Sequence, residues 1–264
     1  MSKHIQYNKK EPLSAWRKVS LSSWKPRGDS AVYAFEDIVF DDLLKYSKLH
    51  NLHIHTLIVK ALSIALYHNP RVNSTIRFGK IYNRSDNSIF VHVLPNPEND
   101  DLTGYTITNA HSLNLHSIQT ESELAIETIQ NKKDPFTKSK NTFAQLPQFG
   151  VQLLMNTLSF ILFKLNIHYP LFNVPKNPFG SIMLTSVGSL GMQQALCPIA
   201  PYTNNSMVVS IGKIRKMPVV IDNVITQKEV CTMGFTFDHR LIDGIQFKRF
   251  FEAFTNALHE IVIT

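Results

Sequence analysis

The sequence predicts an α/β protein in which helices pack on a mixed β-sheet. Two observations predict this fold class. Apolar residues recur at helical spacing in several segments, and short runs rich in β-branched and aromatic residues lie between them. Some helices alternate with strands while other strands follow one another directly, which is typical of a layered domain with a mixed sheet. The 264 residues are enough to bury one large core.

Helices are expected at residues 41–50, 56–68, 117–131 and from about 245 to the end. Acidic residues in the first turn favour the first helix, and Asn69-Pro70 ends the second. The last helix carries an aromatic and aliphatic face: Phe247, Phe250, Phe251, Phe254, Leu258 and Ile261. A further apolar stripe covers residues 151–165, and polar residues interrupt it, so a core or interface helix is favoured over a membrane contact.

Strands are expected at residues 31–39, 181–186, 206–214 and 229–237. Residues 74–82 and 88–94 are expected to form a strand pair, joined by the turn-prone segment 83–87.

Composition and charge exclude several classes of protein. The formal net charge of +7 favours anionic partners, but the cationic residues are scattered, so nucleic-acid binding is not expected. No signal peptide and no apolar run of membrane-spanning length are indicated. Cys197 and Cys231 have no CxxC spacing and are expected to be buried thiols in a reducing, cytoplasmic environment.

The most informative segment is Phe-Thr-Phe-Asp-His-Arg-Leu-Ile-Asp-Gly at residues 235–244. It places His239 at the end of an apolar strand, just before an amphipathic helix. A neutral imidazole in a rigid position can take a proton from a thiol, hydroxyl or amine. Gly244 is expected to let the chain turn from strand to helix. The alternative is that His239 is a structural histidine.

This segment resembles the DHRxxDG signature of the acyltransferase component of 2-oxo acid dehydrogenase complexes. Four other segments are similar to motifs of that family, in the same order: residues 12–18, 59–73, 107–115 and 180–191. The family shares its fold with chloramphenicol acetyltransferase. The resemblance therefore implies a chloramphenicol acetyltransferase-like two-layer α/β domain with a mixed sheet packed by helices.

The resemblance also implies roles for single residues. His239 matches the general base, and Thr185 matches a hydroxyl residue that binds the tetrahedral oxyanion, with adjacent Ser186 as a possible substitute. Asp243 and Arg17 match an ion pair that braces the histidine segment. The competing idea is that Asp243 orients the imidazole directly, as in a hydrolase triad.

Substrates and partners follow from the same resemblance. Coenzyme A or acyl-CoA is expected as a substrate, with no metal. A homotrimer, or a multiple of trimers, would place the histidine of one subunit against the hydroxyl residue of its neighbour. Residues 1–11 are expected to be a tail and residues 12–264 a single catalytic domain, with no lipoyl domain or lipoyl attachment site.

The acyl acceptor is left open by the sequence: a free thiol, an amine, an alcohol, or a lipoyl or carrier domain on another protein. Two alternatives to a CoA-dependent acyltransferase also remain. One is a non-catalytic trimeric scaffold of the same fold. The other is a condensation-type enzyme that uses carrier-protein thioesters.

Overall fold

The computed structural model describes residues 7–10, 30–95, 103–131, 133, 148–167 and 177–263. The expected N-terminal tail is covered only at residues 7–10, and the opening motif with Arg17 lies outside the described residues.

The described residues form a seven-stranded mixed sheet with the order β2-β10-β8-β7-β5-β6, and β9 pairs with one end of β10. Its strands are β2 (Ala31–Val39), β5 (Ser88–Val93), β6 (Thr103–Thr108), β7 (Ile182–Ser186), β8 (Met207–Ile211), β9 (Arg215–Ile221) and β10 (Val224–Asp238). Strand β7 is parallel to both β5 and β8, and the other pairs are antiparallel. The predicted fold class is confirmed, although β6 and β9 were not predicted.

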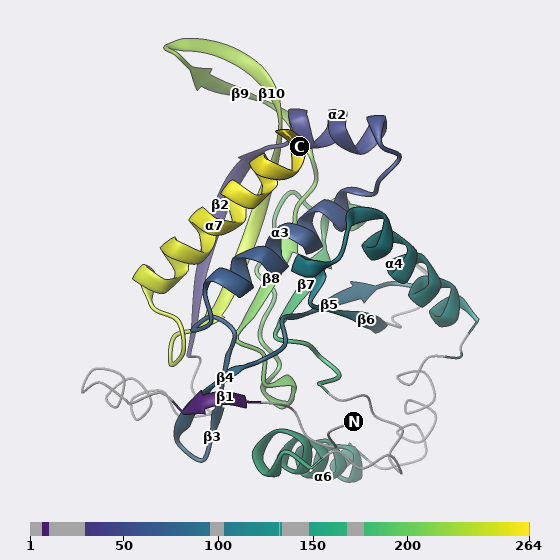
Figure 1. Ribbon diagram of the computed structural model, residues 1–264, viewed down its shortest axis with the longest axis vertical. Helices are drawn as coiled ribbons and strands as arrows, with labels where there is room; N and C mark the ends of the chain where they lie inside the picture. The colour runs from purple at the N-terminus through teal and green to yellow at the C-terminus, as the bar shows by residue number, and fades with distance from the viewer. Residues whose placement is uncertain are drawn as a thin grey trace.

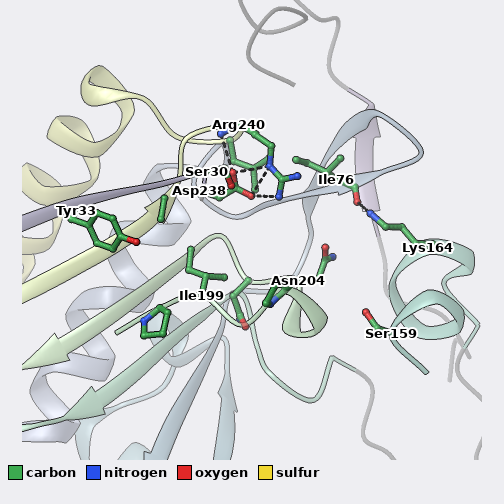
Figure 2. Close-up of a pocket in the computed structure, with 14 residues that line it drawn as sticks. Ser30, Tyr33, Ile76, Ser159, Lys164, Ile199, Asn204, Asp238 and Arg240 are labelled. Atoms are coloured by element: carbon green, nitrogen blue, oxygen red, sulfur yellow. Dashed lines mark hydrogen bonds and ion pairs between the residues drawn. The ribbon is translucent and has the colours of Figure 1, made fainter. Parts of the chain in front are cut away.

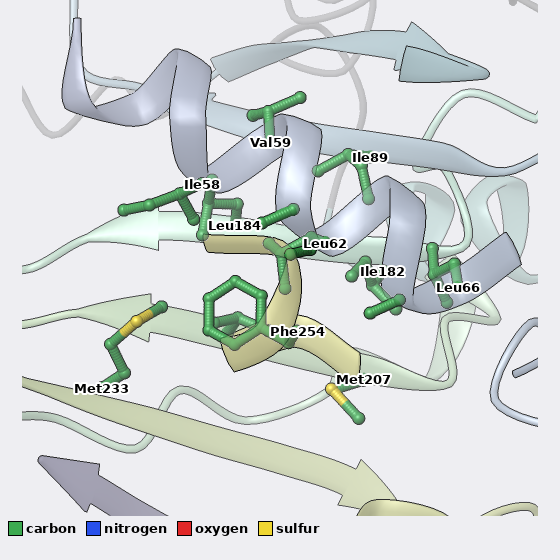
Figure 3. Packing of buried hydrophobic residues seen from close by; sticks show 14 of the residues in the cluster. Ile58, Val59, Leu62, Leu66, Ile89, Ile182, Leu184, Met207, Met233 and Phe254 are labelled. Carbon is green, nitrogen blue, oxygen red and sulfur yellow. The ribbon is translucent and has the colours of Figure 1, made fainter. Parts of the chain in front are cut away.

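Helices cover one face of this sheet (Figure 1). They are α2 (Asp41–Leu49), α3 (Ile54–His68), α4 (Leu115–Gln130) and α7 (Gly244–Ile263). Between α3, α7 and the sheet lies the main core, where Leu62, Ile182 and Phe254 are all completely buried (Figure 3). The aromatic stripe predicted for the last helix packs as expected, since Phe250, Phe254, Leu258 and Ile261 are buried. Apolar burial on this one face explains why the helices lie there.

Local signals account for the helix ends. The first turn of α2 carries Asp41 and Asp42, whose charges favour the positive end of the helix dipole. Helix α4 begins at an N-cap, where the side chain of Asn114 accepts a hydrogen bond from the backbone N–H of Ser117 at 2.8 Å. Helix α3 begins two residues earlier than predicted and ends at His68, with Asn69 as its C-cap directly before Pro70.

The prediction for residues 74–94 is wrong in its pairing. Strands β3 (Ser74–Arg77) and β4 (Lys80–Arg84) form a tight hairpin, with positive φ at Phe78 and Gly79. This hairpin belongs to a separate three-stranded sheet with β1 (Tyr7–Lys10). Strand β5 instead pairs with β6 and β7 in the large sheet. The polar composition of residues 83–87 favoured a turn there. Phe78 and Gly79 form the turn instead, because both adopt the positive φ that a two-residue hairpin loop requires.

The sheet face opposite the helices is crossed by the segment 192–200. The hydroxyl of Ser210 donates to the carbonyl of Ala195 at 2.5 Å, and Cys197 and Ile199 pack on buried apolar residues of this face. Two glycines make the close approach possible. A Cβ at Gly212 would lie 2.0 Å from the carbonyl oxygen of Gln193, and one at Gly234 would lie 2.5 Å from that of Ala195.

The apolar stripe at residues 151–165 forms helix α6 (Gln148–Ser159), continued by the π-helix η2 (Phe160–Leu165). Its contacts are with the small sheet and with the loop before β8. Arg77 donates from Nε and Nη2 to the carbonyl of Lys164, and Ser159 donates to the carbonyl of Tyr202. Phe163 of this stripe is buried, whereas Leu153, Phe160 and Leu165 are exposed, and the core or interface helix stays a prediction.

A search of the described residues for membrane-spanning helices found no single helix that is both long and apolar enough. Helices α2 and α3 pass the test of length and composition only as a pair, and they are bent by 115° at the break between them.

Candidate active site

The turn after β10 holds His239 in a fixed position. The backbone N–H of His239 donates to the carbonyl of Ser30 at 2.8 Å. The carbonyl of Asp238 accepts hydrogen bonds from the N–H groups of Leu241 and Ile242, both at 2.9 Å. The side chains of Leu241 and Ile242 are buried in the main core. The histidine is therefore carried by a turn that is anchored on both sides and that directly follows the strand β10.

The imidazole of His239 has a defined tautomer. Its Nδ1 lies 3.2 Å from the carbonyl oxygen of Ile242. A carbonyl oxygen can only accept a hydrogen bond, so Nδ1 must carry the proton, and Nε2 of the neutral ring is left as the basic nitrogen. This contact also bears on the triad-like alternative for Asp243. The nitrogen that a triad carboxylate would hold is already bound to a backbone carbonyl.

Asp238 and Arg240, the neighbours of His239, form a close ion pair that the sequence analysis missed. Arg240 Nη2 lies 2.6 Å from Asp238 Oδ2, and Arg240 Nε lies within 3.1 Å of both carboxylate oxygens. Asp238 Oδ1 also accepts from the backbone N–H of Arg240 at 3.0 Å. The two side chains are 8% and 24% exposed. The signal in the sequence for this pair is that oppositely charged residues directly precede and follow His239.

Asp243 caps helix α7. Its Oδ1 accepts from the backbone N–H groups of Ile245 and Gln246 at 3.2 and 3.3 Å, while Gln246 Oε1 accepts from the N–H of Asp243 at 2.9 Å. This reciprocal arrangement is a capping box. The ion pair between Asp243 and Arg17 stays a prediction, since Arg17 lies outside the described residues.

Gly244 does not act as predicted. Its φ is not among the positive values of the chain, and a Cβ built on it would meet no atom within 4 Å. The strand-to-helix turn therefore does not require a glycine at this position.

Thr185 and Ser186 end β7, and both are half-buried. Successive side chains of a strand point to opposite faces, so only one of the two hydroxyls lies on each face of the sheet. Ile182 and Leu184 belong to the core under the helices, which places Ser186 on that face. Thr185 shares the opposite face with Met183, beneath the segment 192–200.

Thr185 and His239 are far apart within one chain. In the register of the sheet, Thr185 is paired with Ser210 of β8, and Ser210 is paired with Gly234 of β10. His239 lies five residues beyond Gly234, so the strand spacing of about 4.8 Å and a rise of about 3.3 Å per residue give a separation of about 19 Å. The structure does not bring these two predicted site residues together in a single copy.

A pocket of about 450 Å³ opens beside the Asp238–Arg240 pair. Figure 2 shows Asp238 and Arg240 at one side of the pocket and Lys164 with Ser159, from η2 and α6, at the other. The other labelled residues are Ser30 directly before β2, Tyr33 in β2, Ile76 in β3, Ile199 from the segment over the sheet, and Asn204. The sequence did not predict this pocket, because its walls come from five separate parts of the chain.

Burial changes the pKa of several groups on and near the sheet. It lowers the pKa of His92, and the nearby backbone carbonyl of Leu184 opposes this effect to a smaller extent. It raises the pKa of Cys197, and it raises that of Cys231 to about 11. Cys231 is completely buried, as predicted. The described residues contain no cluster of three or more His, Cys, Asp or Glu side chains suited to a metal ion.

Comparison with known proteins relates the C-terminal part of the chain to one family. Residues 179–262 match the family model of the 2-oxoacid dehydrogenases acyltransferase (catalytic domain). This range includes Thr185, His239 and all of the segment from β7 to α7 except its last residue, Ile263. The predicted resemblance to this family is confirmed. The dihydrolipoyllysine-residue acetyltransferase component of the pyruvate dehydrogenase complex of Zymomonas mobilis is 32% identical over 81 residues, which cover 31% of this chain and 18% of that relative.

Solved structures extend the likeness in fold to nearly the whole chain. A probable dihydrolipoamide acetyltransferase from Listeria monocytogenes has a TM-score of 0.64 at 18% identity, covering 96% of this chain and 95% of that one. The cubic core of a pyruvate dehydrogenase multienzyme complex has a TM-score of 0.63 at 16% identity, covering 98% and 96%. Chloramphenicol acetyltransferase has a TM-score of 0.57 at 13% identity, covering 95% and 100%. The acyltransferase-like fold is therefore confirmed.

Proposed function

We propose that this protein transfers an acyl group between a CoA thioester and a thiol acceptor, with an amine or alcohol as the other possible acceptors. The observation that carries the proposal is the hydrogen bond between His239 Nδ1 and the carbonyl of Ile242. In the neutral ring this hydrogen bond places the proton on Nδ1, so that Nε2 is the nitrogen that can act as a general base. The family match over residues 179–262 supports the same chemistry.

The reaction needs two functions that the described residues can supply. His239 Nε2 takes the proton of the attacking thiol, and the thiolate then forms a bond to the thioester carbonyl carbon. Thr185 Oγ1 donates a hydrogen bond to the oxyanion of the tetrahedral intermediate, because negative charge develops on that oxygen. When the intermediate collapses, the bond to the leaving sulfur breaks and His239 returns its proton to that sulfur.

One active site is proposed to use two copies of the chain. The separation of about 19 Å between Thr185 and His239 exceeds what a single tetrahedral intermediate can bridge, since reacting atoms must come within about 3–3.5 Å of their partners. A homotrimer, in which His239 of one copy faces Thr185 of the next, would remove this separation. Relatives whose structures are cores of multienzyme complexes support an oligomer of this kind.

Exposed apolar side chains offer surfaces for such contacts. The tip of the β9–β10 hairpin exposes Val220, Val224 and Ile225, and these are 60–75% accessible. The hairpin extends beyond the rest of the sheet (Figure 1). A projecting apolar hairpin is typical of a segment that packs on another subunit.

Release of free CoA thiol from a panel of acyl-CoAs tests the proposal, with thiol, amine and alcohol acceptors supplied in turn. Removal of a general base reduces the rate by about 10²–10⁴-fold, so His239→Ala should lose turnover to that extent while remaining folded. His116→Ala is the matched control, because His116 is an exposed histidine on α4. Absence of turnover in the wild-type protein with every donor and acceptor would instead favour the non-catalytic scaffold.

A further inference from the structure

The pocket beside the Asp238–Arg240 pair has the features of a binding site with a particular charge. Its lining includes Asp238 and Arg240, the chain neighbours of His239, and Leu241 of the same turn. One wall, from α6 and η2, lies outside the range that matches the acyltransferase family model.

Positive charge predominates among the residues that line the pocket. Among the described lining residues, Lys164 and Arg240 are cationic and Asp238 is the one carboxylate, which gives a formal charge of +1; Arg240 pairs with Asp238, so the net charge comes from Lys164. Burial lowers the pKa of Lys164, and the charges of Arg240 and Arg77 lower it further. The three cations are thus close enough to repel one another. Lys164 Nζ donates to the carbonyl of Ile76 at 2.7 Å, which uses one of its three protons.

A second feature is the buried amide of Asn205, which is 3% exposed and lines the same pocket. Its Nδ2 donates to the carbonyls of Phe179 and Gly180 at 2.7 and 3.0 Å. These two acceptors fix the orientation of the amide. Asn205 Oδ1 is consequently an acceptor with no hydrogen-bond partner among the described residues. Buried polar atoms are nearly always paired, so this oxygen indicates a missing donor.

We propose that this pocket binds an anionic group of a substrate, a phosphate or a carboxylate, between Lys164 and Arg240, while an N–H or O–H of the same molecule donates to Asn205 Oδ1. The inference rests on the proposed function in one respect, that the occupant is a substrate of the reaction at His239. The volume of about 450 Å³ suits a small acid or one portion of a larger molecule.

Two sources carry this chemistry. Coenzyme A has phosphates and amide N–H groups, and a small acidic acceptor has a carboxylate next to an amide, amine or hydroxyl. In both cases Lys164, which lies in η2, is the counter-ion of the anionic group. It therefore favours substrates that carry such a group. Charge-assisted hydrogen bonds are among the stronger polar contacts, so losing one should weaken binding about tenfold or more.

The test measures binding by calorimetry, without turnover, for Lys164→Gln and for the control Lys45→Gln, whose lysine is 78% exposed on α2. The probes are CoA, neutral pantetheine, inorganic phosphate and N-acetylglycine. Lys164→Gln should bind phosphate about tenfold more weakly than the control does, with pantetheine binding unchanged. An equal loss for CoA would identify CoA as the source, and a loss for N-acetylglycine without one for CoA would identify an acidic acceptor.

A second variant separates charge from folding. Lys164→Arg keeps the positive charge and should retain phosphate binding within about threefold of the wild type. The proposal is overturned if Lys164→Gln binds every anionic probe as the control does, or if it loses pantetheine to the same extent. Because binding is measured directly, a protein that binds anions through Lys164 but transfers no acyl group would contradict only the proposed function.

Discussion

The ion pair that flanks His239 gives the most direct prediction about how the site is held together. Asp238→Ala removes a carboxylate that receives contacts of 2.6–3.1 Å from Arg240, together with one backbone hydrogen bond. Breaking a buried pair by removing one partner costs about 3–5 kcal/mol, whereas exposed pairs contribute about 0–1 kcal/mol. Arg240 is 24% exposed and can recruit water, so a loss between these limits is expected, about 2–3 kcal/mol of unfolding free energy.

Urea denaturation of four proteins measures this value: the wild type, Asp238→Ala, Arg240→Met and the double variant. A loss of 2–3 kcal/mol corresponds to a fall of about 5–10 °C in Tm for a domain of this size. The double variant has no uncompensated charge and should be more stable than the sum of the single losses predicts. Asp238→Ala should also lower kcat, because the same carboxylate is adjacent to His239.

The control for this cycle is the exposed pair between Lys45 and Asp42, whose side chains are 78% and 73% exposed. Lys45→Ala, which keeps the Asp42 charge at the start of α2, should leave the unfolding free energy nearly unchanged. Losses for Asp238→Ala and Arg240→Met that add within about 0.5 kcal/mol would show that the two residues act independently. That result would refute the reasoning that the pair supports the turn as a unit.

Two further predictions concern Asp243 and Cys231. Asp243→Ala removes the N-cap of α7 and should lower the unfolding free energy by about 1 kcal/mol, while Asp243→Ser should keep most of it. An equal loss of unfolding free energy in both variants would indicate that the negative charge of Asp243 contributes more than its N-cap hydrogen bonds, as the predicted ion pair with Arg17 requires. Burial raises the pKa of Cys231 to about 11, so its thiol should resist alkylation at pH 8 until the protein unfolds. Above the ordinary pKa of 9.0 the unfolded chain loses this proton first, so stability should fall as pH rises toward 11.

The long periodic elements were predictable from the sequence because their patterns are local. The helical face of α7 and the strand β2 lie where apolar spacing and β-branched residues place them. Strand β9 was missed because Pro218 interrupts its alternating pattern, although Val219 to Ile221 are typical strand residues. Strand pairing was less predictable. Which strand β5 joins depends on long-range contacts that no local pattern reports.

Only the part of the site that lies within one contiguous motif could be predicted from the sequence. The position of His239 followed from its motif, but the carbonyl of Ile242 that sets its tautomer depends on the backbone conformation of the turn. The distance between Thr185 and His239 depends on the order of three strands, which the sequence did not reveal. Lys164 entered the account only with the structure, since a lysine in an apolar helix is ordinarily interpreted as a solvated charge.

The central claim is that His239 of one copy works with Thr185 of another, and subunit mixing tests it most directly. His239→Ala and Thr185→Ala proteins, each inactive in acyl-CoA turnover, are unfolded together, refolded at equal concentrations and assayed. In a ring of like interfaces, a random mixture restores both residues at about one quarter of the sites, so about one quarter of the wild-type activity is expected. No recovery of activity, in a mixture shown to have exchanged subunits, would contradict a site shared between copies.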